Sequence, residues 1–311
     1  MSIVSIIIPT YNRSKLVKES IDSLLAQTHN DLEIHVVDDG STDDTQQTVT
    51  GIAQKDNRVR YYSRPHLGTS AARNFGLEQS NGEFVCFFDH DDLWPPNYIE
   101  TMVKSLQANP DFGVAYSKAM TFGDICGEYA ASGTWPSGFV AYDLFASKLF
   151  MLPSSTIFRR SVLDGIRFET LLRTCEAFDV LLRVSTRTKF LFVPNLYAMH
   201  LERDDTAGPI AGKDLVVNIP RVLERFYFQL GDKSCIPKRL AFCKISRRYR
   251  RAALDHYKAG CRTASIALLK KALSYDPFDL RLYLNLFRAF MLNPRNDKMP
   301  DWQLPPALPP L

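Results

Sequence analysis

The sequence lacks any long apolar run. No segment approaches the roughly 18 residues that a membrane-spanning helix needs, so we expect no such helix. The first residues contain neither a basic region nor a small-residue cleavage site, which favours a first strand over a signal peptide. The six cysteines form no CxxC or Cys/His motif, and we expect reduced thiols in a cytoplasmic protein.

Charge is unevenly distributed along the chain. Residues 211–311 contain 19 basic and 8 acidic side chains, a balance of +11. Because the 311 residues together carry a net charge of +4, residues 1–210 carry −7. The sequence therefore predicts an acidic N-terminal body and a basic C-terminal region with different partners.

Strands and helices alternate in the N-terminal third. Apolar runs at residues 3–8, 33–37 and 84–88 indicate buried parallel strands, and amphipathic or capped segments follow the first two. This alternation predicts an α/β fold with a mainly parallel central sheet flanked by helices. Ligands bind such sheets beyond the carboxyl ends of the strands.

The most informative segment lies at the end of the third apolar run. Residues 84–88 are followed at once by Asp89, Asp91 and Asp92. Burying three carboxylates is costly unless a cation or hydrogen-bond donors neutralise them. A hard divalent cation, Mn²⁺ or Mg²⁺, that also binds phosphate oxygens removes this cost. The segment therefore predicts a site for a nucleotide diphosphate.

Five short motifs in this order resemble those of the family 2 inverting glycosyltransferases with the GT-A fold. They are Pro9-Thr10-Tyr11-Asn12, Gln27-Thr28, Asp38-Asp39-Gly40-Ser41-Thr42-Asp43, Ala71-Ala72-Arg73-Asn74 and Asp89-His90-Asp91-Asp92. The resemblance covers residues 1–206. It implies metal-dependent transfer of a sugar, with inversion, from a nucleotide-diphosphate donor to a glycan or lipid-linked acceptor. Bacterial surface polysaccharide synthesis at the inner face of the plasma membrane is the implied setting.

The resemblance and the chemistry of the side chains assign the same roles. The expected nucleotide-sugar-binding residues are Pro9, Thr10, Tyr11, Asp39, Arg73, Asp89, His90 and His200. Tyr11 would stack on the base, and Asp39 would accept a ring N–H, which favours UDP- or dTDP-sugars although guanine offers the same donor. Arg73 would pair with phosphate. Asp91 would bind the metal, and Asp89 would hold the ribose or the metal through water. His90 is expected to point away from its neighbours.

A plainer alternative exists for each of these residues. Tyr11 could pack against the strand end, Asp39 could form only a turn or a helix cap, and Arg73 could lie on a helix surface. Asp89 and Asp91 could form a solvated turn, and His200 could be a structural histidine.

The position of the general base departs from the family pattern. An inverting transferase needs a carboxylate to deprotonate the acceptor hydroxyl, and in the family this is the Asp of a Glu-Asp pair. Here Glu176 is followed by Ala177. Three explanations stay open: a substitution that traps substrates, replacement by Glu176 or Asp179, or a protein that binds donor without turnover. On a helix Asp179 lies roughly 200° from position 177, so it cannot simply replace the base.

The C-terminal third is expected to be helical and basic. Residues 238–251 carry seven positive charges, and Leu240, Phe242 and Tyr249 could lie on an anionic membrane surface. The alternative is a solvated helix face that packs on the catalytic domain. No nucleic-acid-binding module accompanies the charge, so we expect no nucleic acid partner. Residues 252–277 resemble one tetratricopeptide-type hairpin.

We expect a glycosyltransferase domain at 1–210, with a donor half at 1–110 and an acceptor half at 111–210. A basic helical region at 211–293 and a proline-rich tail at 294–311 follow it. The sequence also bears on two other functions. A non-catalytic scaffold that binds nucleotide sugar fits the same motifs. A nucleotidyltransferase would carry a Gly-rich basic loop after the first strand, which Pro-Thr-Tyr-Asn-Arg is not.

Overall fold

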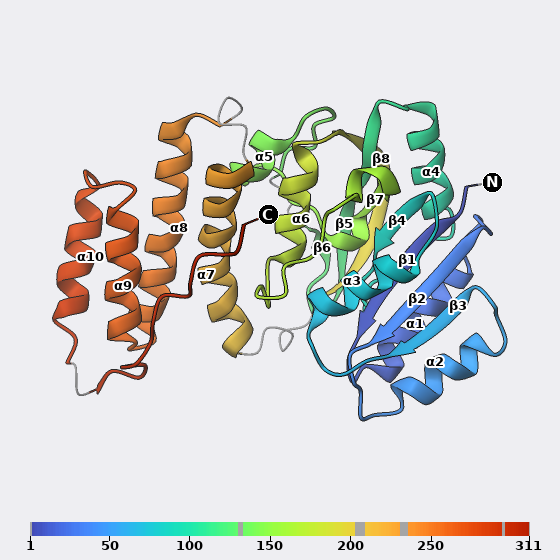
Figure 1. The fold of residues 1–311 in the computed structure, drawn as a ribbon, viewed down its shortest axis with the longest axis horizontal. Coiled ribbons are helices and arrows are strands. Elements are labelled where there is room, and N and C mark those ends of the chain that lie inside the picture. Colours follow the sequence, from blue (N-terminus) through green and yellow to red (C-terminus); the bar gives the residue numbers. More distant parts are fainter. Residues whose placement is uncertain (1, 130–132, 203–208, 231–235, 294–295, 311) are drawn as a thin grey trace. The chain divides into compact units, whose positions relative to one another are not determined.

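The structure is a computed structural model that describes residues 2–129, 133–202, 209–230, 236–293 and 296–310. The chain divides into two compact units, Met1–Thr206 and Ala207–Leu311. We call them the N-terminal unit and the helical unit (Figure 1). Each is described by itself.

The N-terminal unit is built on an eight-stranded sheet. Its strands are β1 Val4–Thr10, β2 Leu32–Asp38, β3 Val59–Ser63, β4 Phe84–Phe87, β5 Phe112–Gly123, β6 Gly127–Glu128, β7 Thr156–Arg159 and β8 Lys189–Glu202. The order is β3-β2-β1-β4-β7-β5-β6, and β8 pairs with β5. The first four strands are parallel, whereas β7 runs antiparallel to both of its neighbours. The predicted mainly parallel α/β sheet is confirmed.

Helices cover both faces of this sheet. They are α1 Ser14–Leu25, α2 Thr45–Ala53, α3 Thr69–Gln79, α4 Tyr98–Ala108, α5 Ala141–Phe145 and α6 Glu176–Ser185, with 3₁₀ turns at Pro153–Ser155 and Arg160–Leu163. Side chains of α1, α2 and α4 pack with Ile6 and Ile8 of β1 in one core. On the other face α3 approaches closely, because Gly76 lies directly against Ile7 and Val37. A side chain at residue 76 would push this helix away from the sheet.

The strands expected at residues 3–8, 33–37 and 84–88 begin within one residue of β1, β2 and β4. β8 extends from Lys189 to Glu202, because it continues to pair with β5 past a register shift. α2 begins only at Thr45, so Ser41 does not cap it. Ser41 instead accepts the backbone N–H of Asn12 (2.8 Å), so its hydroxyl joins two strand ends.

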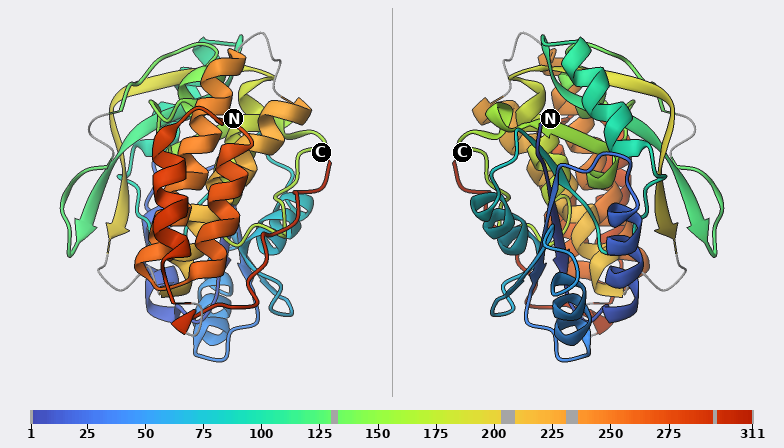
Figure 2. Two further views of the ribbon diagram at one scale, coloured as in Figure 1. Left: turned by 90° about the vertical axis from the view of Figure 1, so that its left-hand side faces the viewer. Right: turned by 90° about the vertical axis from the view of Figure 1, so that its right-hand side faces the viewer.

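The helical unit contains α7 Pro209–Arg225, a π-helical turn at Phe226–Leu230, α8 Lys238–Lys258, α9 Arg262–Leu273 and α10 Leu280–Phe290. The expected hairpin is formed by α8 and α9, and α10 lies beside α9 at the end of this row of helices (Figures 1 and 2). Residues 303–310 form neither helix nor strand. They pack within the same unit, where Leu308 is buried and Arg221 donates to the carbonyl oxygen of Pro306 (2.9 Å).

A buried carboxylate joins the amino ends of the central strands. Glu33 at the start of β2 accepts hydrogen bonds from the Ser5 hydroxyl (2.6 Å) and from the backbone N–H groups of Asn81 (2.6 Å) and Gly82 (3.0 Å). Burial acts to raise the pKa of Glu33, but these donors outweigh it and lower the pKa to about 2. Burial keeps the neighbouring His35 predominantly neutral by lowering its pKa despite the nearby carboxylate.

Glu33→Gln should therefore destabilise the fold in a pH-dependent way. A lowered folded-state pKa contributes stability above the unfolded value near 4.5, and this contribution is lost as pH falls toward 2. We expect a loss of roughly 1–2 kcal/mol at neutral pH. Urea unfolding between pH 3 and 7 measures it, with exposed Glu19→Gln as the control. A Glu33→Gln penalty that stays constant with pH would contradict the assignment.

Candidate functional site

A polar pocket of about 250 Å³ lies at the carboxyl edge of the parallel strands. Its lining residues are Pro9, Thr10, Tyr11, Asp39, Thr69, Arg73, Asp89, His90, Asp91 and Glu176. They lie at or just after the carboxyl ends of β1, β2 and β4, or in the first two turns of α3 and α6. Parallel strands end at one edge of a sheet, which is why segments far apart in the sequence meet here.

Several residues of the sequence motifs hold this edge together. Asn12, in a left-handed conformation, uses its side-chain oxygen to accept the backbone N–H groups of Thr42 (2.7 Å) and Asp43 (3.3 Å). Asn74 of α3 exchanges two hydrogen bonds with the backbone of Phe168 (2.7 and 2.9 Å). These motif residues therefore fix the loops that surround the pocket.

Arg73 is buried between two carboxylates. Its guanidinium donates to Asp89 at the end of β4 (2.6 Å) and to Glu176 at the start of α6 (2.6 Å). Burial alone would lower its pKa, but the two carboxylates raise it, so the charge is retained. The sequence predicts that Arg73 pairs with phosphate. In the structure, two of its N–H donors are already bonded to carboxylates of the protein.

Asp39 has a role that the sequence did not indicate. Its carboxylate accepts the backbone N–H groups of Leu67 and Gly68 (both 2.8 Å) and pairs with His66 (2.9 Å). His66 in turn lies 4.3 Å from Tyr11, ring centroid to ring centroid. Asp39 thus fixes the loop before α3, and that loop places His66 beside the half-exposed Tyr11. The loop sequence carried no motif, so sequence reasoning missed His66.

Asp91 is the candidate metal ligand of the acidic cluster. It lines the pocket, and we find no hydrogen bond to its carboxylate among the described residues. Asp89, by contrast, gives one oxygen to Arg73. No group of three or more His, Cys, Asp or Glu side chains in the described ranges could hold a metal by itself. Asp91 is a hard oxygen ligand of the kind Mg²⁺ and Mn²⁺ prefer, and a ligand's phosphate oxygens would have to complete the coordination.

The third aspartate is structural. Asp92 is fully buried and accepts hydrogen bonds from His200 (2.7 Å) and from the Ser154 hydroxyl. Burial would lower the pKa of His200, but the hydrogen bond to Asp92 raises it to about 9. Burial raises the pKa of Asp92, and the hydrogen bond from His200 opposes this rise. His200, expected to touch phosphate, is instead placed against Asp92, and it does not line the pocket.

The first turn of α6 separates the three candidates for the base. Glu176 lines the pocket, bound to Arg73. The Ala177 methyl lines a small apolar hollow with Phe168. Asp179 is buried and pairs with Arg183 (2.8 Å), and neither Asp179 nor Ala177 is among the residues that line the pocket.

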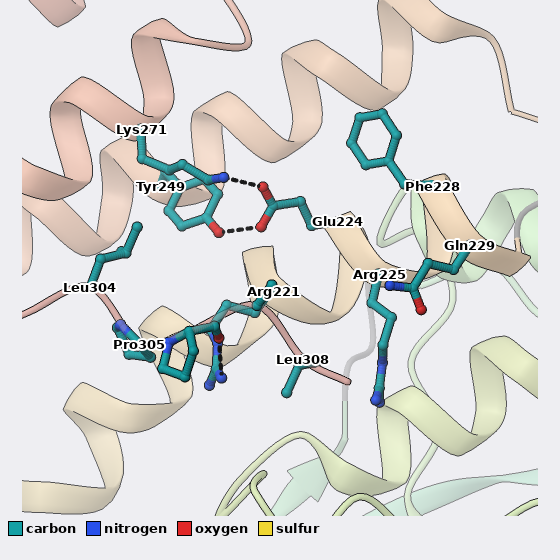
Figure 3. A pocket seen from close by; sticks show the side chains of 12 residues that line it. Arg221, Glu224, Arg225, Phe228, Gln229, Tyr249, Lys271, Leu304, Pro305 and Leu308 are labelled. Atoms are coloured by element: carbon teal, nitrogen blue, oxygen red, sulfur yellow. Dashed lines mark hydrogen bonds and ion pairs between the residues drawn. The ribbon is translucent and has the colours of Figure 1, made fainter. Parts of the chain in front are cut away.

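A second pocket lies in the helical unit, and several of the polar side chains that line it bond to one another (Figure 3). Lys271 and Tyr249 both point to the Glu224 carboxylate, each at 2.6 Å, and Tyr275 donates to it as well. The chain's own residues 304–308 form one wall. These contacts join α7, α8, α9 and the tail, and we assign this second pocket a structural role.

Two of the aromatic side chains in the basic stretch 238–251 pack inside the helical unit. Tyr249 is buried, and Phe242 packs against Tyr227, Phe228 and Tyr275. The expectation that Tyr249 contacts a membrane surface is therefore wrong, because its side chain is buried. No described helix is long and apolar enough to cross a bilayer.

An acidic pocket at the carboxyl edge of a doubly wound sheet, in this strand order, defines a GT-A glycosyltransferase. The sequence profile described as "Glycosyl transferase family 2" matches residues 5–167, just over half of the chain. The chain belongs to glycosyl transferase family 2, and the resemblance seen in its motifs is confirmed.

Curated relatives match in part. An uncharacterized glycosyltransferase from Rickettsia felis is 44% identical over 106 residues, which is 34% of this chain and 17% of that protein. A GalNAc(5)-diNAcBac-PP-undecaprenol beta-1,3-glucosyltransferase from Campylobacter jejuni is 30% identical over 169 residues, 53% of this chain and 54% of that protein. The matches thus span between about a sixth and about half of these relatives' lengths.

Solved structures share the fold. S. aureus TarS in complex with UDP-GlcNAc superposes with a TM-score of 0.66 at 19% identity, covering 94% of this chain and 89% of that chain. The mannosyltransferase PcManGT from Pyrobaculum calidifontis, in complex with GDP-Man and Mn²⁺, gives 0.60 at 20% identity, covering 93% and 86%. At these identities the likeness establishes the fold alone.

Removing Arg73 should destabilise the N-terminal unit strongly. Arg73→Ala leaves Asp89 and Glu176 close together without their shared cation, and loss of one partner of a buried ion pair costs about 3–5 kcal/mol. Urea unfolding measures the loss. Lys104→Ala, which breaks the exposed Lys104–Glu100 pair, is the control and should change stability far less. Equal effects in the two variants would show that the buried triad is not stabilising.

Proposed function

We propose that this chain is a metal-dependent, inverting glycosyltransferase whose N-terminal unit binds a nucleotide-diphosphate sugar in the pocket at the carboxyl edge of β1, β2 and β4. The observation that carries the proposal is the convergence of Tyr11, Asp39, Asp89 and Asp91 on one cavity. The ligands of two solved structures with the same fold support a nucleotide-sugar donor. TarS was solved with UDP-GlcNAc, and PcManGT with GDP-Man.

Tyr11 and His66 would receive the base. Their ring centroids lie 4.3 Å apart, Tyr11 lines the pocket, and Tyr11 is 42% exposed, which leaves a face for stacking. The two Asp39 oxygens already accept one backbone N–H each, yet a carboxylate oxygen can accept a second donor. A ring N–H of uracil or thymine would supply it, so UDP- or dTDP-sugars are the favoured donors.

Asp91 would hold Mn²⁺ or Mg²⁺ together with the donor's diphosphate, with Asp89 near the ribose or a metal-bound water. Such a cation neutralises the diphosphate as it leaves. Arg73 acts beside it by holding Asp89 in place and by compensating one of the carboxylate charges of the pocket. In this assignment it is a positioning residue.

The acceptor hydroxyl would attack the anomeric carbon from the side of α6, losing its proton to a base as the diphosphate leaves. Glu176 is the carboxylate of that helix that lines the pocket, but it already accepts a hydrogen bond from Arg73. We therefore propose that position 177 belongs to the base and that this chain, with Ala177, is inactive or impaired. The Campylobacter relative's name supports a lipid-linked acceptor.

The rival is a non-catalytic protein that binds nucleotide sugar and uses the helical unit as a docking surface. The same pocket contacts favour it, and the methyl of Ala177 is the feature that keeps it open. Turnover by a base-restored variant separates the two.

Asp91→Asn should weaken binding of UDP in the presence of Mn²⁺ by at least about tenfold, because a neutral amide is a much poorer ligand for a hard cation. Isothermal titration calorimetry with and without EDTA measures this. Asp111→Asn is the charge-matched control, because it changes an exposed carboxylate that does not line the pocket. Metal-independent binding, unchanged in Asp91→Asn, would refute the metal assignment.

Ala177→Asp should raise transfer by about 10²- to 10⁴-fold, the range typical of a positioned general base. Release of nucleoside diphosphate from UDP- and dTDP-sugars, with lipid-linked acceptors, gives the rate. Ala177→Asn has a similar shape but cannot accept the proton, and it should remain at the parental rate. Donor binding without turnover in Ala177→Asp would instead favour the non-catalytic rival.

A further inference from the structure

The last helix of the helical unit is apolar on the side that faces solvent. The described residues of α10 and its preceding turn leave seven large hydrophobic side chains between 48% and 90% exposed. They are Phe278, Leu280, Tyr283, Leu284, Phe287, Phe290 and Met291. Monomeric soluble proteins rarely expose contiguous apolar patches of this kind without a partner.

These side chains form one face. Residues three, four and seven apart share a side of a helix, so Leu280, Leu284, Phe287 and Met291 follow one stripe. α10 packs on its own unit through the opposite side, where Leu282 and Ala289 are fully buried. The exposed stripe, which we call the α10 face, therefore points away from α8 and α9, the helices that α10 contacts.

Arginines outnumber carboxylates along the α10 face. Arg281 and Arg288 are exposed on one flank, and the Arg262 guanidinium lies 5.6 Å from the Phe290 ring centroid. Residues 280–293 contain no Asp or Glu. Asp279, the nearest acid before the helix, and Arg281 neutralise each other through a two-point contact (2.7 and 2.8 Å), and Asp276 also interacts with Arg281. The net positive charge of the rim therefore comes from Arg262 and Arg288.

We propose that the α10 face docks on an anionic lipid bilayer, with its apolar stripe in the headgroup boundary and its arginines against lipid phosphates. Leu, Phe and Tyr on one side with Arg beside them are typical of helices that lie in a membrane interface. Attraction to anionic lipid adds to the apolar burial. The balance of +11 over residues 211–311 acts in the same direction.

A second copy of the chain fits the α10 face less well. In a twofold contact the same face meets itself, which would bring the arginines of both copies to one rim. Asp279, the carboxylate nearest to the face, is already bonded to Arg281 of its own helix, so it is not free to pair with Arg288 of the other copy. The proposal does not depend on sugar transfer, because the α10 face shares no residue with the pocket of the N-terminal unit.

Sedimentation of the full chain with lipid vesicles tests the proposal. Binding is expected to phosphatidylcholine vesicles that contain phosphatidylglycerol and to be much weaker to phosphatidylcholine alone. The double variant Leu284→Gln/Phe287→Gln should bind more than about tenfold more weakly, because each apolar side chain loses its burial. Arg288→Gln should bind about fivefold more weakly and show a reduced dependence on salt.

A matched control separates the α10 face from general stickiness. Phe139→Gln/Leu171→Gln changes the same residue types, with similar exposure, in the N-terminal unit and should bind vesicles like the parent. Circular dichroism and UDP binding establish that every variant is folded. Equal vesicle binding by parent and Leu284→Gln/Phe287→Gln overturns the proposal, as does no binding to anionic vesicles. A parent dimer that this variant converts to monomer, in analytical ultracentrifugation, assigns the face to a second copy instead.

Discussion

The pocket depends on one buried arginine side chain, that of Arg73. Arg73 on α3 bonds simultaneously to Asp89, at the end of β4, and to Glu176, at the start of α6. Without it, two carboxylates would lie close together at the edge of the sheet, and the electrostatic cost would oppose both the turn after β4 and the position of α6. Asp91, two residues beyond Asp89, lines the same pocket. Architecture and ligand chemistry are thus coupled through a single guanidinium.

The motif residues divide into two classes once their contacts are known. Asn12, Asn74 and Asp92 satisfy backbone or side-chain partners inside the fold, so they fix loops. Tyr11 and Asp91 line the pocket; Tyr11 is 42% exposed, and the Asp91 carboxylate accepts no hydrogen bond within the described part of the chain. Burial makes the first class rigid, and this rigidity holds the second class in a defined arrangement before any ligand arrives.

The two units differ in what they present. The N-terminal unit gathers acidic groups in a cavity, whereas the helical unit uses its carboxylate Glu224 internally and leaves arginines and apolar side chains of α10 at its surface. This difference follows from the charge asymmetry already visible in the sequence, −7 against +11. The basic stretch 238–251 is less exposed than its composition suggested, because Phe242 and Tyr249 form part of the aromatic core of the helical unit.

The sequence by itself determined the α/β class, the parallel strands and the edge at which Asp39, Asp89 and Asp91 gather, because apolar runs and strand-end motifs are local features. Only the tertiary structure decided that Arg73 is engaged by Glu176, 103 positions away, and that His200 is engaged by Asp92, 108 positions away. It also placed His66 beside Tyr11 and turned the apolar stripe of α10 outward. Such contacts depend on how distant segments pack, and no local pattern of residues encodes them.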